Sequence, residues 1–179
     1  MCHFFSSSRE LVDGLVPYFE AGIDRNERCI WVAAAPLPAG DVESAVAKSP
    51  KLKRGAAIGQ LTVHHAIDWF GEPAELNAEQ IIRRWFSEEE RALADGFGGL
   101  RITGNSAFIP HGHWSGLMDY ERLLHERLPE RRIIACCSYD RQQCGSVEIM
   151  EVVNCHHGAL DRTDQRWEFF LGSPNVDAR

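Results

Sequence analysis

Apolar residues are distributed along the chain in two kinds of segment that follow one another in alternation. Short continuous apolar runs indicate strands covered on both faces, and segments with apolar residues three and four positions apart indicate helices. The predicted strands are residues 3–5, 29–33, 60–64, 99–104, 133–139 and 166–171, and the predicted helices are residues 8–22, 41–48, 78–94, 116–128 and 146–153. This alternation predicts an α/β protein with a mainly parallel sheet and helices on both faces.

Capping signals precede three of the predicted helices. Ser7 is followed by Glu10 at the spacing of a capping box, in which a side chain bonds a free N–H group of the first helical turn. Asn77 and Gln80 repeat that arrangement before the helix of residues 78–94. Ser115 is expected to cap the helix that begins at residue 116.

The segment 78–94 has the clearest amphipathic pattern of the chain. Its apolar face contains Ile81, Ile82, Trp85, Phe86 and Leu93. Gly96 is expected to end this helix, and its acidic residues 88–90 are predicted to face solvent. The basic stretch Lys48–Arg54 contains a proline and is predicted to be a solvated loop.

The turn after the first predicted strand carries Phe5-Ser6-Ser7-Ser8-Arg9, where nucleotide-binding proteins of this layout have a glycine-rich loop. Neither GxxxxGK[ST] nor GxGxxG occurs in the chain. Ligands of parallel sheets bind beyond the carboxyl ends of the strands. A ligand site is therefore expected near residues 5–8, 34–36, 104–107 and 138–141, and it lacks the usual means of holding phosphate.

Composition narrows the classes of partner and the location. A length of 179 residues fits one domain, expected at residues 1–171, followed by a flexible tail at 172–179. The net charge of −7 disfavours a nucleic-acid partner. No apolar run reaches the roughly 18–20 residues of a membrane span, and the first residues do not resemble an export signal. A cytoplasmic protein with six free cysteines is expected.

With these segments in place, the chain resembles the MEDS family, a sensory domain of methanogens, methylotrophs and the dichloromethane-responsive regulator. The resemblance extends from His3 to His157. It rests on His3–Phe5 before a capped helix, Glu27–Val32, Gly96–Gly104 followed by Asp119-Tyr120-Glu121, and Cys137–Asp140 with His157 downstream. Asn105 departs from the family, which usually has a glutamate there; an amide can form hydrogen bonds but cannot act as a base.

The resemblance implies a degenerate RecA/KaiC-like fold that has lost its phosphate-binding loop. It also implies sensing of a small organic molecule, with the signal passed to a separate histidine kinase or transcription regulator. A homo-oligomer is compatible with the RecA-like relationship. The resemblance gives no cofactor.

Residues at the strand ends and at the polar positions of the family form the predicted ligand site. They are His3, Phe5, Trp31, Arg101, Asn105, Cys137, Tyr139 and His157. Phe108 and Trp114 are further candidates for apolar walls, and residues 106–114 are expected to become ordered when a ligand binds. The alternative for His3 and Tyr139 is a purely structural role as hydrogen-bonded core residues.

Two other functions remain open from the sequence. A metal- or redox-responsive sensor would use His3, Cys137, Cys155 and His157, because thiolate and imidazole suit zinc, copper or iron. Residual nucleotide binding without hydrolysis is a further alternative. Catalysis is not expected, since the chain has no serine nucleophile elbow and no HExxH motif.

Overall fold

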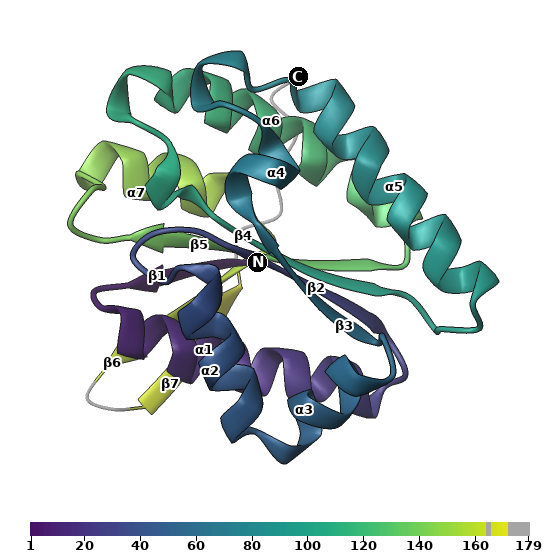
Figure 1. Ribbon diagram of the computed structural model, residues 1–179. Coiled ribbons are helices and arrows are strands. Elements are labelled where there is room, and N and C mark those ends of the chain that lie inside the picture. Colours follow the sequence, from purple (N-terminus) through teal and green to yellow (C-terminus); the bar gives the residue numbers. More distant parts are fainter. Residues whose placement is uncertain (164–165, 172–179) are drawn as a thin grey trace.

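The structure is a computed structural model that describes residues 1–163 and 166–171. Within these residues, seven strands form one sheet in the order β3-β2-β4-β5-β1-β6-β7 (Figure 1). The strands are β1 (Cys2–Phe5), β2 (Arg28–Ala33), β3 (Leu61–His65), β4 (Leu100–Asn105), β5 (Ile133–Asp140), β6 (Gly158–Thr163) and β7 (Arg166–Leu171). All neighbours pair in parallel except β6 and β7. The predicted mainly parallel sheet is confirmed.

Helices cover both faces of the sheet (Figure 1). One layer contains α1 (Ser8–Asp24), α2 (Ala39–Lys48) and α3 (Pro50–Ala57), and the other contains α4 (Ala66–Phe70), α5 (Ala78–Ala94), α6 (Trp114–Arg127) and α7 (Ser146–Asn154). Short 3-10 turns lie at η1 (Pro73–Glu75), η2 (Ser106–Phe108), η3 (His111–His113) and η4 (Leu128–Glu130). None of the helices in the described part of the chain is long and apolar enough to cross a lipid bilayer.

Each helix layer encloses its own apolar core against the sheet. Successive residues of a strand point to opposite faces, so neighbouring positions belong to different cores. Cys137 contributes to the core beneath α5 and α6, and Cys136 contributes to the core beneath α1 and α3. The first face is called the α5/α6 face below, and the second the α1/α3 face.

The register between β1 and β5 decides which side chains meet. Cys2 lies opposite Cys137 and Phe4 lies opposite Tyr139, and all of these belong to the α5/α6 core. His3 lies opposite Ser138, so its side chain points to the α1/α3 face.

Two of the three predicted caps are confirmed. The Ser7 hydroxyl accepts the Glu10 N–H at 3.2 Å, and the Asn77 side chain accepts the Gln80 N–H at 3.0 Å. Helix α5 has the predicted bounds, and Gly96 follows it with a φ of 88°. The prediction for Ser115 is wrong, because α6 begins at Trp114, two residues before the expected start, and Ser115 lies inside the helix.

The basic stretch Lys48–Arg54 is not a loop. Pro50 begins helix α3, where proline is tolerated because the first turn has no intrahelical partner for its N–H group. The Ser49 hydroxyl caps the turn by accepting the Leu52 N–H at 3.2 Å, and Leu52 is buried. The proline that suggested a break is therefore the start of a helix.

The acidic run 88–90 is not uniformly solvated. Glu89 is only 2% exposed, forms an ion pair with Arg131 at 3.1 Å and accepts the N–H group of Arg132. It lies one helical turn after the buried Trp85, on the same face of α5. Leu93, predicted on the apolar face, is 36% exposed.

Strand β6 was not predicted, although its partner β7 was. The expected tail at 172–179 lies outside the described residues.

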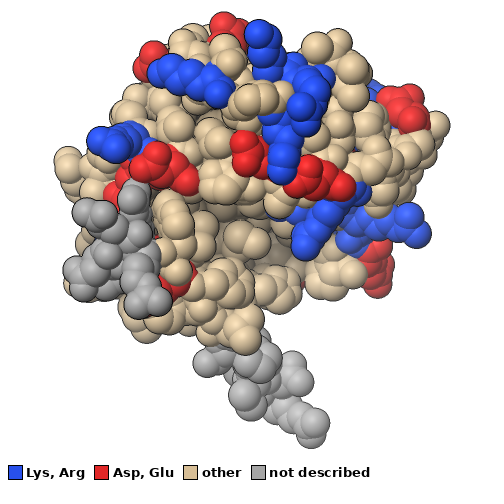
Figure 2. All heavy atoms as spheres, turned by 90° about the horizontal axis from the view of Figure 1, so that it is seen from below, with Lys and Arg blue, Asp and Glu red and all other residues tan. Residues whose placement is uncertain are grey.

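On the surface of the α1/α3 layer, Lys and Arg side chains lie among Asp and Glu side chains and do not form one continuous basic patch (Figure 2).

Candidate functional site

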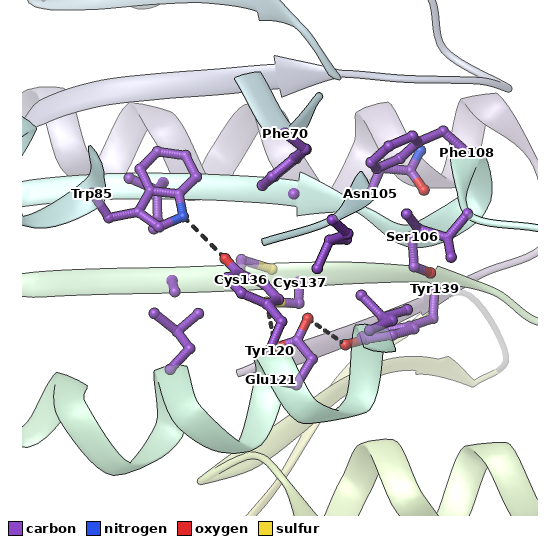
Figure 3. A pocket seen from close by; sticks show the side chains of 17 residues that line it. Phe70, Trp85, Asn105, Ser106, Phe108, Tyr120, Glu121, Cys136, Cys137 and Tyr139 are labelled. Carbon is purple, nitrogen blue, oxygen red and sulfur yellow. Dashed lines mark hydrogen bonds between the residues drawn. The ribbon is translucent and has the colours of Figure 1, made fainter. Parts of the chain in front are cut away.

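A cavity lies between the α5/α6 face of β4 and β5 and the helices that cover it (Figure 3). Its volume is about 30 Å³, which is room for one or two water molecules. The lining residues are Phe70, Leu76, Trp85, Ile102, Gly104, Asn105, Ser106, Phe108, Ile109, Leu117, Tyr120, Glu121, Leu124, Ala135, Cys136, Cys137 and Tyr139. Most of the wall is apolar or aromatic.

Aromatic rings define one side of this cavity. Phe70 from α4 stacks on Phe108 with ring centroids 5.5 Å apart. Trp85 from α5 donates its indole N–H to the hydroxyl of Tyr120 at 3.0 Å (Figure 3). Because this hydrogen bond satisfies both buried polar groups, the rings form a fixed wall.

Glu121 supplies a carboxylate at the other side of the cavity. It shares the inward stripe of α6 with Leu117 and Leu124, four positions before it and three after it, and is 4% exposed. Its carboxylate accepts the Tyr139 hydroxyl at 2.8 Å and the Cys137 thiol at 3.3 Å (Figure 3).

His156 completes this group from the turn that follows α7. Its Nε2 atom lies 3.4 Å from a Glu121 oxygen, and its Nδ1 atom lies 2.7 Å from the carbonyl oxygen of Val152. A carbonyl oxygen can only accept, so the hydrogen-bond network assigns a proton to Nδ1. Nε2 is therefore the ring atom directed at the carboxylate.

Burial and hydrogen bonding set the charges of this cluster. Burial alone would raise the pKa of Glu121, but the interactions with His156, Tyr139 and Cys137 outweigh it and hold that pKa below its usual value. Burial and the neighbouring Glu121 charge raise the pKa of Cys137 and of Tyr139 well above their usual values. Glu121 is the charged acceptor, and the thiol and the phenol are neutral donors.

A second and smaller cavity of about 20 Å³ lies on the other side of the same cluster. It is lined by Met1, Glu121, Leu124, His125, Leu128, Ala135, Cys137, Cys155, His156 and His157. Glu121 and Cys137 line both cavities. Glu121, Cys137 and His156 thus lie between the aromatic cavity and the smaller cavity, which Met1 also lines.

The structure separates His3 from Cys137, contrary to the prediction that they line one pocket. The His3 ring is completely buried on the α1/α3 face, 5.3 Å from the ring of Trp167. Among the described residues its two nitrogens have no hydrogen-bonding partner. Burial, together with the positive charge of Arg141, lowers the pKa of His3 to about 4.

Three more predicted site residues lie away from the cavity. Phe5 and Trp31 are core residues of the α1/α3 face. Arg101 is on the same face, where it forms a buried ion pair with Glu27 at 2.6 Å and lies over the ring of Tyr18 at 4.6 Å. Side-chain alternation along β1, β2 and β4 explains this placement.

Cys137, Tyr139 and Asn105 do line the cavity. Asn105 has a structural part in it: its side-chain N–H donates to the Ala35 carbonyl at 2.9 Å and its oxygen accepts the Ala107 N–H at 3.0 Å. These bonds join the loop after β4 to the loop after β2. Of the other predicted walls, Phe108 lines the cavity and Trp114 packs at its rim, 6.4 Å from the Tyr139 ring.

The predicted metal-binding set is not assembled as such. His157 is exposed and its ring packs on His125 at 4.4 Å, and His3 lies across the sheet. Cys155 lines the smaller cavity beside His156. The three residues that do converge are Glu121, Cys137 and His156, whose ligand atoms all lie within 4.8 Å of one another. The sequence prediction missed Glu121 and took His157 instead of its neighbour.

Comparison with known proteins supports the assignment of the fold. A KaiC-like protein from the hyperthermophilic archaeon Pyrococcus horikoshii OT3 superposes with a TM-score of 0.60 at 9% sequence identity, over 94% of this chain and 73% of that one. At this identity the likeness concerns the fold alone, and it confirms the RecA/KaiC-like architecture. No curated protein matches the chain by sequence.

The sequence match to a family covers most of the chain. The profile of the MEDS family, the methanogen/methylotroph, DcmR sensory domain, matches residues 1–157. This match spans β1 to the turn after α7, and so includes Glu121, Cys137, Tyr139 and His156. The chain therefore belongs to the MEDS family of sensory domains.

Proposed function

We propose that this sensory domain binds a small organic molecule in the aromatic cavity and passes the signal to a separate protein, without catalysing a reaction. The observation that carries this proposal is the composition of the cavity wall. Aromatic and aliphatic side chains surround it, and one buried carboxylate, Glu121, lies at its side. A site of this kind suits a compact ligand with an apolar body and one hydrogen-bond donor.

The cavity must enlarge to admit such a ligand. Its present 30 Å³ is far below the roughly 300–1,000 Å³ of small-molecule pockets. Outside the wall lies an open hollow of about 380 Å³, and Ser106, Phe108 and Ile109 line both spaces. Displacement of residues 106–109 would join the cavity to the hollow. This segment is the lid of the proposed site.

Trp114, the first residue of α6, connects the region of the lid to helix α7. Trp114 lines the hollow, and its indole N–H donates to Glu151 of α7 at 2.9 Å. A change in the lid can therefore reach the surface of α7. The output partner that fits the family is a histidine kinase or a transcription regulator, and ligand binding would shift the domain between two states.

Phenol is a suitable first probe, with toluene as a matched ligand that lacks the hydroxyl group. We expect phenol to raise the melting temperature more than toluene, because a hydrogen bond to a charged group contributes about 1.5–3 kcal/mol. Tyr139→Phe keeps the ring but removes one donor to Glu121, and it should weaken phenol binding while the fold is retained. Unchanged phenol affinity would remove Tyr139 from the site.

A cavity-filling substitution provides the control for location. Ala135→Val adds two carbon atoms to the cavity wall, whereas Ala159→Val makes the same change on β6, outside this wall. Phenol should stabilise Ala159→Val as it does the wild type and should stabilise Ala135→Val much less. Equal stabilisation of both variants, or stabilisation of neither the variants nor the wild type, would contradict the proposed site.

A further inference from the structure

Three side chains with different metal-ligating atoms converge between the two cavities. Glu121 comes from α6, Cys137 from β5 and His156 from the turn after α7, and each is less than one tenth exposed. We propose that Glu121, Cys137 and His156 bind one divalent transition-metal ion of the zinc class. This inference does not depend on the proposed organic ligand, because the three residues would bind the ion in its absence.

The separation of the ligand atoms fits a tetrahedral ion. The Glu121 oxygen lies 3.3 Å from the Cys137 sulfur and 3.4 Å from Nε2 of His156. In a tetrahedral zinc site, bonds of about 2.0–2.3 Å place neighbouring ligand atoms roughly 3.3–3.6 Å apart. The separation of Sγ from Nε2 is within 4.8 Å.

Two hydrogen bonds already orient the ligands as an outer shell does in metal sites. The Val152 carbonyl holds the Nδ1 proton of His156, so Nε2 is the atom directed at the centre. The Tyr139 hydroxyl holds one oxygen of Glu121, and the other oxygen faces the thiol and the imidazole. Both ligands are thus held in the orientation that an ion requires.

Electrostatics favours a cation at this position. Glu121 carries its charge in the buried cluster, and a bound cation would lie against it and against a thiolate. The Cys137 thiol donates to Glu121, so it carries its proton before an ion binds. Coordination deprotonates a thiol, so one proton is expected to leave Cys137 as the ion enters.

The types of ligand set the class of the ion. A thiolate and an imidazole favour zinc, iron or copper over magnesium and calcium, which prefer oxygen ligands. Three protein ligands leave a fourth tetrahedral position, as in zinc sites that accept water or a small molecule. The aromatic cavity adjoins Glu121 and Cys137 and has room for a water molecule there.

Cobalt(II) spectroscopy on the full chain, freed of any affinity tag and stripped with a chelator, tests this proposal. We expect one equivalent of cobalt to bind, with a thiolate-to-cobalt charge-transfer band and the intense d–d bands of tetrahedral cobalt, and zinc to displace it. Because this readout uses the wild-type protein, it remains decisive if a variant fails to fold. Absence of the charge-transfer band would overturn the proposal.

Variants identify the ligands. Cys137→Ser should abolish the charge-transfer band, whereas Cys155→Ser and His157→Gln, which change the neighbouring Cys and His, should leave it intact. Tyr139→Phe should keep the stoichiometry but weaken cobalt binding by about 10–100-fold, the usual effect of removing an outer-shell partner. A band that survives Cys137→Ser in folded protein, or is lost in Cys155→Ser, would overturn the assignment.

Discussion

His3 is a completely buried imidazole whose ring nitrogens have no hydrogen-bonding partner among the described residues. Its pKa is lowered from 6.5 to about 4, so it is neutral in the folded protein at neutral pH. This explains why a histidine can occupy an apolar position beside Trp167. His3 is therefore a buried residue of the α1/α3 face, across the sheet from the candidate cavity.

Stability should depend on this residue in mildly acidic solution. Between pH 6.5 and about 4 the unfolded chain binds a proton at His3 and the folded chain does not. The contribution of His3 to the free energy of unfolding should therefore be present in full above pH 6.5. As the pH drops toward 4, this contribution should fall by at most about 1.4 kcal/mol per pH unit. Urea unfolding at several pH values measures it.

The substitution His3→Leu should flatten this pH dependence, because it removes the group that must be kept neutral. His157→Gln is the matched control, since His157 is exposed. We expect the control to retain the wild-type slope. A His3→Leu variant with the same pH dependence as the wild type would contradict this explanation.

Helix α1 packs closely on the sheet at Gly22. A Cβ atom there would lie 2.7 Å from both the Arg101 side chain and the Cys29 sulfur. Gly22→Ala should therefore lower the free energy of unfolding by about 1–3 kcal/mol, the usual cost of overpacking. Gly40 in α2 is exposed and has open space around its Cα, so Gly40→Ala should raise the same quantity by about 0.5–1 kcal/mol. Equal effects of the two substitutions would refute this difference in packing.

The lid segment, residues 106–109, is expected to limit the rate at which a ligand enters the cavity. Phe108→Ala removes the stacking on Phe70 and one wall shared by the cavity and the outer hollow. We expect phenol to associate faster with this variant, because the wall between the cavity and the outer hollow is smaller. Stopped-flow measurements of tryptophan fluorescence can follow the association, since Trp85 lines the cavity and Trp114 lines the hollow. Slower or unchanged association would show that the ligand enters elsewhere.

Elements were predictable where local chemistry determines them. Helix α5 was predicted with its observed bounds, because a capping side chain, an amphipathic stripe and a terminal glycine agree. Strand β6 was missed because it has no continuous apolar run, and its position depends on β1 and β7. Helix α3 was missed because Pro50 marks both loops and helix starts.

The site was less predictable than the fold, because it depends on register and on buried charge. The pairing of β1 with β5 decides whether His3 lies on the same face of the sheet as Tyr139. A shift of this pairing by one residue would move His3 to the other face. Glu121 was given no role because a glutamate in a helix usually faces solvent. The available signal was its spacing from Leu117 and Leu124, which places it on the apolar stripe.

At the scale of the whole molecule, the sheet is KaiC-like, and the proposed ligand site lies away from the turn after β1. The turn after β1 has Ser6-Ser7-Ser8 in place of a phosphate-binding loop. The cavity lies instead under α6, on the α5/α6 face of β4 and β5. Over the opposite layer, basic and acidic side chains lie among one another (Figure 2).

The central claim is that this MEDS domain holds a small organic molecule in the aromatic cavity. Native mass spectrometry of the protein, as purified and after incubation with small alcohols and phenols, tests it most directly. We expect a one-to-one organic adduct on the wild type and on Ala159→Val, and we expect Ala135→Val to lose it. The bare chain mass under every condition, or the same adduct on all three proteins, would contradict it.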